Sequence, residues 1–128
     1  MNLLIDTHVA LWMFNEHENL STSAKEYLMD ESNFLYISIA TAWEIAIKHS
    51  LGKLTDFPGG VSLFLSQIYN SPIEIITILP QHVEIVEKLP FIHKDPFDRL
   101  LIATAKSEEL TIITVDENIR KYDVDCIW

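Results

Sequence analysis

Short, continuously apolar segments alternate along the chain with longer segments of helical character. The strand-like segments are Asn2–Ile5, Phe34–Ser38, Ile73–Leu79 and Thr111–Val115, with Val124–Trp128 as an expected edge strand. Strands without polar alternation are typical of a sheet that helices cover on both faces. Their separation by helices indicates strand–helix–strand units. The chain therefore predicts an α/β fold with a central, mostly parallel sheet.

Capping signals set the expected helix boundaries. Asp6 or Thr7 is placed to cap a helix from His8, and Gly52 is expected to end the helix that follows the second strand. A Ser23-x-x-Glu26 capping box is expected to open a helix that reaches Ser32, and the Asp95-Pro96 start a helix that reaches about Leu110. Further helices are expected at Val61–Tyr69 and at Gln81–Leu89, the latter with Val83 and Val86 inward. A helical turn is expected at Glu117–Lys121.

Size and composition limit the class of protein. A chain of 128 residues with 48% hydrophobic residues predicts one globular domain over residues 1–128. Cys126 is the only cysteine, and no apolar run approaches the roughly 18 residues that cross a bilayer, so we expect a cytoplasmic protein without a membrane segment. The net charge of −10 argues against a protein that simply coats nucleic acid.

Four acidic residues fall where strands are expected to end or helices to begin. They are Asp6, Glu44, Asp98 and Asp116. Because ligands of parallel sheets collect beyond the carboxyl ends of the strands, we expect these acids to converge. Close carboxylates stay ionised together only with a compensating cation, and an all-oxygen set suits Mg²⁺ or Mn²⁺ rather than zinc. Such a site favours hydrolysis of phosphodiester bonds.

Each acid also has a purely structural interpretation. Asp6 and Asp95 are both candidate helix caps, and Asp98 suits the position of a capping-box partner for Asp95. Glu44 is placed either to close a box with Thr41 or to pair with Lys48, and Asp116 is a candidate turn residue. Taken singly these interpretations are the stronger ones, but they do not explain why four caps share one edge of a sheet.

The same residues carry a family resemblance over essentially the whole chain. Leu4-Ile5-Asp6-Thr7-His8 and the segment from His93 to Ala103 resemble the two signatures of PIN-domain ribonucleases of the VapC toxin type. Ala42–Ala46 with Lys48 is similar to the middle acidic helix of that family, and Thr114-Val115-Asp116 to its last acid. The segment from His93 is the most specific of these motifs.

The resemblance implies a PIN-like fold of three layers, α/β/α, and an endoribonuclease that depends on Mg²⁺ or Mn²⁺. It implies a homodimer, and neutralisation by a cognate antitoxin protein. Carried over by position, the metal-binding catalytic acids are Asp6, Glu44, Asp98 and Asp116, with Asp6 and Asp98 as principal ligands and Asp95 as a structural residue. The alternatives are a housekeeping PIN nuclease without an antitoxin and a PIN-like interaction module without activity.

Other residues near these motifs have open roles. Thr7 and Thr114 are placed either to orient a carboxylate or to serve as cap hydroxyls. Arg99, Lys48 and Lys94 are candidates for phosphate contacts, with a brace of the sheet edge as the alternative for Arg99 and a pair with Glu44 as the alternative for Lys48. His8 and His93 are weak candidates for a general base, and Trp12 and Trp43 fit a core or a partner groove better than base stacking. Apolar side chains that look exposed are Tyr27, Leu28, Phe64, Ile68 and Tyr69. They fit a dimer interface and the core equally well.

Overall fold

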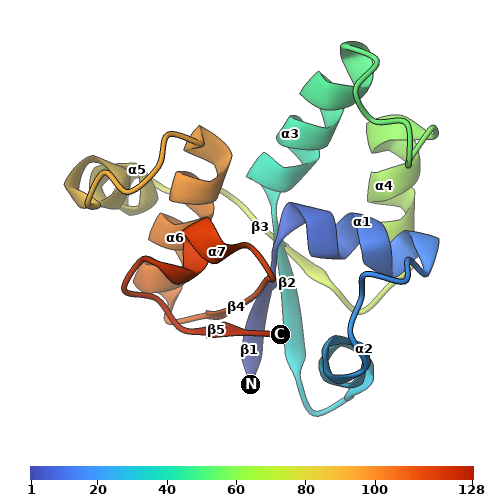
Figure 1. Cartoon of the computed structure of the whole chain (residues 1–128), viewed down its shortest axis with the longest axis horizontal. Helices are drawn as coiled ribbons and strands as arrows, with labels where there is room; N and C mark the ends of the chain where they lie inside the picture. Colours follow the sequence, from blue (N-terminus) through green and yellow to red (C-terminus); the bar gives the residue numbers. More distant parts are fainter.

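The computed structural model describes all residues from 1 to 128, in five strands and seven helices (Figure 1). The strands are β1 (Asn2–Ile5), β2 (Phe34–Ser38), β3 (Glu74–Ile76), β4 (Thr111–Ile113) and β5 (Cys126–Ile127). The helices are α1 (Thr7–Asn15), α2 (Thr22–Met29), α3 (Ile39–Ser50), α4 (Gly60–Tyr69), α5 (Pro80–Lys88), α6 (Pro96–Glu108) and α7 (Glu117–Arg120). None of these helices is long and apolar enough to cross a membrane.

The strands form one sheet in the order β3-β2-β1-β4-β5, and every neighbouring pair is parallel. In the sheet, β2 lies on one side of β1, and β4, which comes later in the chain, lies on the other side of β1. The carboxyl ends of β1 and β4 are adjacent, with Ile5 opposite Ile113 in the register. This reversal of strand order is the place where open α/β sheets bind ligands.

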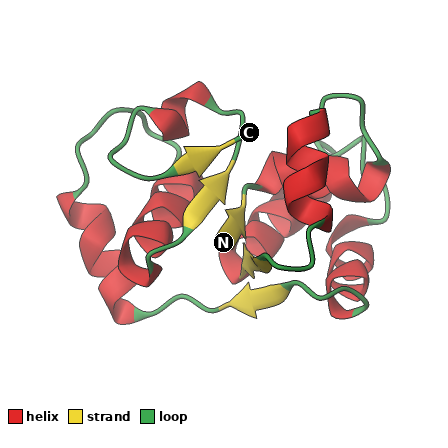
Figure 2. Ribbon diagram, turned by 90° about the horizontal axis from the view of Figure 1, so that it is seen from below, coloured by secondary structure: helices red, strands yellow, loops and turns green.

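Each face of the sheet has its own hydrophobic core. Leu3 and Ile5 of β1 lie in the larger cluster, where Phe64 of α4 is also fully buried. Leu4 lies in the second cluster with Ile102 of α6. Figures 1 and 2 show α5, α6 and α7 on one side of the sheet and α1, α2 and α4 on the other. The predicted three-layer fold is confirmed, and double coverage explains why the central strand has no polar alternation.

The second helix begins two residues earlier than its capping box predicts. Ser21, rather than Ser23, is the cap residue, and its hydroxyl accepts the Ala24 N–H at 3.0 Å. The helix ends at Met29 because the Asp30 carboxylate accepts hydrogen bonds from both the backbone N–H and the hydroxyl of Ser32, which forms a turn. Ser21 and Ser23, two positions apart, are equivalent caps by residue type, and the turn at Asp30 sets the end of the helix.

The inward face of α5 differs from the prediction. Val83 is 56% exposed and Val86 only half-buried, whereas His82 is completely buried. The Nδ1 atom of His82 accepts the Leu79 N–H at 3.1 Å, so its Nε2 atom carries the proton and donates to Glu108 of α6 at 2.8 Å. The helix is therefore rotated relative to the valine-inward expectation, because a histidine with both ring nitrogens satisfied joins α5 to α6.

The surface expected to form a dimer interface is only partly present. Phe64 and Ile68 lie in the core, while Tyr69 is 74% exposed and Tyr27 and Leu28 are half-buried. Of the two alternatives, the core therefore holds for Phe64 and Ile68, and an exposed surface for Tyr69. Phe64 and Ile68 are four positions apart on α4, so both side chains lie on the helix face that packs into the core, while Tyr69 lies outside it.

Candidate functional site

Asp6 follows β1 directly and lies in the cap position of α1, yet its side chain makes no capping hydrogen bond. The carboxylate is 3% exposed, and its Oδ2 atom accepts the hydroxyl proton of Thr114 at 2.9 Å. Thr114 follows the neighbouring strand β4, so the two strand ends are joined through this contact. The interpretation of Asp6 as a simple helix cap is therefore wrong for its side chain.

The surroundings of Asp6 disfavour its charge. The pKa of this carboxyl is raised from 3.8 to about 6, mainly because the group is buried; the charge of Asp98 contributes to the rise, while the Thr114 hydrogen bond and the charge of His8 oppose it. A carboxylate with no cationic hydrogen-bond partner, next to a second carboxylate, is an arrangement that an added cation would stabilise.

Asp98 lies in the first turn of α6 and is half-buried. Burial raises its pKa, the hydrogen bond from His93 lowers it, and the charges of Asp95 and Asp116 raise it. Asp95 is the actual cap, since its Oδ1 atom accepts the backbone N–H groups of Phe97 and Asp98 at 2.9 and 3.1 Å. Asp95 therefore has the structural role predicted for it. The Asp98 carboxylate takes no part in capping the helix and is available for the site.

Glu44 is buried on α3, and both of its oxygens have partners. Oε1 accepts the hydroxyl of Thr7 at 2.8 Å and Oε2 accepts the ammonium of Lys48 at 2.7 Å. The expected pairing of Glu44 with Lys48 is present. A capping box with Thr41 is not, because Ser38 caps α3.

Asp116 lies at the end of the β4 segment and caps α7, with its Oδ1 atom accepting the Asn118 N–H at 2.8 Å. Its own N–H donates to the Thr114 hydroxyl at 3.0 Å. Thr114 therefore connects Asp116 to Asp6. Asp116 combines the turn role that its sequence position suggests with an electrostatic influence on Asp98.

The four predicted acids thus occur at one edge of the sheet. Asp6 and Asp98 interact through their charges, Thr114 joins Asp6 to Asp116, and Glu44 and Asp98 line one small cavity with Thr7. No three acidic, histidine or cysteine side chains lie close enough together to form a complete metal site. The oxygen-only donors fit a divalent ion such as Mg²⁺, which proteins often hold through one or two carboxylates with water and substrate phosphate completing its shell.

A chain of hydrogen bonds behind Asp98 was not predicted. The Nε2 atom of His93 lies 2.9 Å from Oδ2 of Asp98, and its Nδ1 atom lies 2.8 Å from the Tyr122 hydroxyl. Arg99 donates to the same hydroxyl at 3.0 Å, so the tyrosine must donate its own proton to Nδ1. The Nε2 proton of His93 then points at Asp98. His93 thus orients the Asp98 carboxylate. This role depends on the contact of His93 with Tyr122, which lies 29 residues further along the chain, so the sequence spacing does not reveal it.

Arg99 is a buried brace rather than a phosphate contact. Besides Tyr122, its guanidinium donates to the carbonyl oxygens of Pro90 at 3.0 Å and Val86 at 3.2 Å, and it lies 4.8 Å from the Phe91 ring centroid. These contacts fasten the start of α6 to the end of α5. His8, in contrast, is exposed on α1.

Replacing Tyr122 by Phe removes the proton donor to His93. We expect kcat for the reaction proposed below to fall about 10-fold, because partners that orient ligating carboxylates typically contribute 10- to 100-fold. KM should stay unchanged because Tyr122 is buried. Steady-state cleavage assays measure both constants. Tyr69→Phe, at an exposed hydroxyl, is the matched control, and equal effects of the two substitutions would contradict the orienting role.

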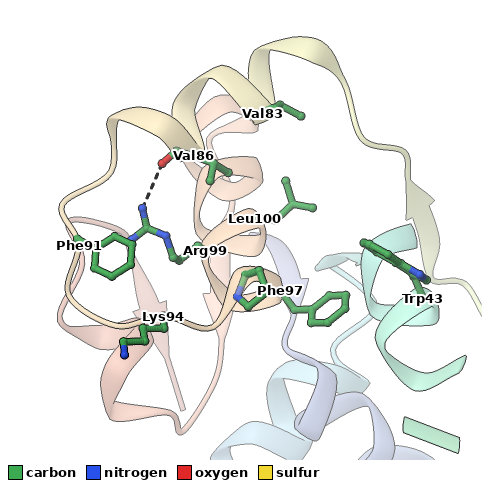
Figure 3. Close-up of a pocket in the computed structure, with 9 residues that line it drawn as sticks. Trp43, Val83, Val86, Phe91, Lys94, Phe97, Arg99 and Leu100 are labelled. Carbon is green, nitrogen blue, oxygen red and sulfur yellow. Dashed lines mark hydrogen bonds between the residues drawn. The ribbon is translucent and has the colours of Figure 1, made fainter. Parts of the chain in front are cut away.

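An apolar pocket of about 330 Å³ lies next to the acidic site (Figure 3). Phe97 and Leu100 of α6 form its floor, facing Trp43 of α3 across the opening, and Val83 and Phe91 lie on the α5 side. Trp43 is 61% exposed, with its ring 5.2 Å from that of Phe97, so it is neither a core residue nor enclosed. Trp43 thus lies on an exposed apolar surface, and its predicted role in a partner groove stays a prediction.

The fold and its acidic edge define a parallel α/β protein with a candidate carboxylate site at the reversal of strand order. The family model described as PIN domain matches residues 3–125. The chain therefore belongs to the PIN domain family, and the resemblance inferred from its motifs is confirmed. A comparison with curated proteins finds no match.

Three solved structures to which this chain is similar share its fold at low sequence identity. VapBC2 from Rickettsia felis, bound to a DNA fragment from its promoter, is 19% identical with a TM-score of 0.74, and the match covers 99% of this chain and 98% of that chain. DNA-bound VapBC from Salmonella typhimurium and VapBC-1 from nontypeable Haemophilus influenzae are both 15% identical, with TM-scores of 0.67 and 0.63, and each match covers 99% of this chain and 97% of the other. These likenesses establish the fold.

Proposed function

We propose that this chain is a metal-dependent endoribonuclease that hydrolyses RNA phosphodiester bonds, and the toxin of a toxin–antitoxin pair. The observation that carries the proposal is the buried Asp6 beside Asp98 at the point of strand reversal, with its pKa raised to about 6. Perturbed carboxylates at a ligand-binding edge are typical of catalytic sites. Membership of the PIN family supports the reaction class.

In this proposal Asp6 and Asp98 hold the ion, which is Mg²⁺ or Mn²⁺, with Glu44 and Asp116 completing its acidic surroundings. The ion, when bound, supplies activation of water and neutralises the charge that develops on the phosphate. Thr114 orients Asp6 through the hydrogen bond at 2.9 Å, and His93 orients Asp98. Thr7 and Lys48 hold Glu44 in place until substrate and ion bind.

The proposed partners are a cognate antitoxin protein and a second copy of this chain. The solved structures that share the fold are VapBC assemblies, which supports an antitoxin here. We further propose that residues 1–128 act as one domain in the cytoplasm, since the family match spans nearly the whole chain and the single cysteine, Cys126, forms no disulfide.

The test is cleavage of a labelled single-stranded RNA by the purified protein with added Mg²⁺ or Mn²⁺ and with a chelator. We expect internal cuts that require the ion and stop in the chelator. Gel analysis of fragments labelled at either end distinguishes internal cuts from trimming. Cleavage that persists in the chelator, or that occurs only from one end, would overturn the proposal.

A further inference from the structure

A second polar pocket, of about 230 Å³, lies on the other side of the acidic site. Thr7, whose hydroxyl holds Glu44, belongs to the walls of both this pocket and the small acidic cavity. The pocket extends from α1 to the segment 53–56 that follows α3, and Asn15 ties these walls together by donating to the Asp56 carbonyl at 2.7 Å. The pocket thus adjoins the proposed active site, and Thr7 is shared between the walls of the two cavities.

Two of the nine basic residues of the chain line this pocket. Gly52 ends α3 in the left-handed conformation, at φ 69°, and the N–H of Lys53 then bonds back to the carbonyl of Lys48 at 2.9 Å. This helix ending places Lys53 beside Lys48, five positions earlier in the chain. Lys48 is paired with Glu44, whereas the Lys53 ammonium makes no hydrogen bond or ion pair, which leaves a free cation beside the acids.

An aromatic side chain forms another wall. Trp12 is half-buried in the pocket lining, with its ring centroid 6.2 Å from that of exposed His8 and 5.8 Å from that of His17. Cationic side chains combined with an aromatic ring are the features that hold single-stranded nucleic acid, by phosphate attraction and by base stacking. The sequence favoured a core or partner-groove role for Trp12, and its ring does pack against the larger core, 6.0 Å from the ring of Trp128. Its place in the pocket lining also gives the ring a surface for contact.

We propose that this pocket binds one nucleotide of single-stranded RNA adjacent to the bond that is cut, with its phosphate at Lys53 and its base against Trp12. The inference rests on the proposed nuclease function. A chain with a net charge of −10 repels RNA over most of its surface, so a local cation beside the acidic edge has a large share in holding the substrate. Asp56, also in the pocket lining, opposes that attraction.

The experiment measures binding of a fluorescein-labelled single-stranded RNA by anisotropy, over a range of salt concentrations, with Asp6→Asn in all proteins to prevent cleavage. We expect Lys53→Gln to weaken binding about 3- to 10-fold and to reduce the slope of log K against log salt by about 0.7, the value for one lost phosphate contact on a single strand. Asp56→Asn should strengthen binding.

Lys25→Gln is the matched control. It removes the same charge from α2, which packs near the amino-terminal end of β1, away from the acidic edge (Figure 1). Equal slopes for Lys53→Gln and Lys25→Gln would overturn the subsite even if the native protein cuts RNA. If only Lys53→Gln reduces the slope of log K against log salt, and the native protein cuts no RNA with any divalent ion, the subsite is upheld and the proposed nuclease function is overturned. Binding of an acidic peptide that depends on Lys53, with no such effect on RNA, would also overturn the subsite.

Discussion

Asp6→Asn is expected to lower kcat for RNA cleavage on the order of 10³-fold, which corresponds to about 4 kcal/mol of barrier. Asparagine keeps the size of the side chain and retains an oxygen that accepts the Thr114 hydroxyl. It loses the negative charge that attracts a divalent ion. The loss of rate therefore reports the charge of the site and not its shape, and initial rates of RNA cleavage at saturating Mn²⁺ measure it.

The same substitution is expected to stabilise the protein without metal at neutral pH. The folded pKa of Asp6, about 6, lies above its ordinary value of 3.8, so folding opposes ionisation of this carboxyl. Its contribution to stability is fully present below pH 3.8 and is lost as the pH rises through about 6. The neutral amide escapes this loss, which by the linkage relation is at most about 3 kcal/mol. Urea unfolding in chelator at pH 4 and pH 7.5 measures the difference.

Asp30→Asn is the control for both measurements, because Asp30 is fully exposed at the end of α2. It should leave cleavage unchanged and should give no comparable gain in stability at pH 7.5. An Asp6→Asn protein that cuts RNA at the native rate would remove Asp6 from the site. A variant that is inactive but less stable at pH 7.5 would show that Asp6 supports the fold.

Much of the fold could be predicted because its determinants are local. β1 and β2 have the bounds that their apolar runs indicate, and Gly52 ends α3 as expected. The bounds of α2 differed because a local cap and a local turn set them, and the inward face of α5 differed because of tertiary packing. The strands expected at Ile73–Leu79 and Thr111–Val115 are shorter, at Glu74–Ile76 and Thr111–Ile113. In α5, neither hydrophobicity nor spacing shows that His82 is buried, because its burial depends on Glu108 of a different helix.

The candidate site also combines features set by the local sequence with features set by tertiary packing. The positions of Asp6, Asp98 and Asp116 after strands or at helix starts could be predicted from the motifs and from parallel topology. The residues that support them could not. Tyr122 reaches His93 across 29 residues, and the side-chain partners of Glu44 depend on how α1 packs against α3.

Asp98→Asn and Asp95→Asn form the most discriminating pair of substitutions, because the two aspartates lie three residues apart at the start of α6. Asn caps a helix about as well as Asp, so Asp95→Asn should change stability by less than about 0.5 kcal/mol and cleavage by less than about 2-fold. Asp98→Asn should lower kcat by about 10²- to 10³-fold, because it removes one of the two carboxylates that we propose to hold the ion. Circular dichroism and cleavage rates measure both effects.

Combining Asp98→Asn with Asp6→Asn tests whether the two carboxylates act through one ion. If each is needed to hold it, the double variant should be no slower than the slower single variant, since residues that act as a unit give non-additive losses. Independent roles predict instead that the two losses multiply, to about 10⁵-fold or more. A multiplied loss, or a larger effect of Asp95→Asn than of Asp98→Asn, would contradict a shared ion, because two ligands of one ion act as a unit and Asp95 is only the helix cap.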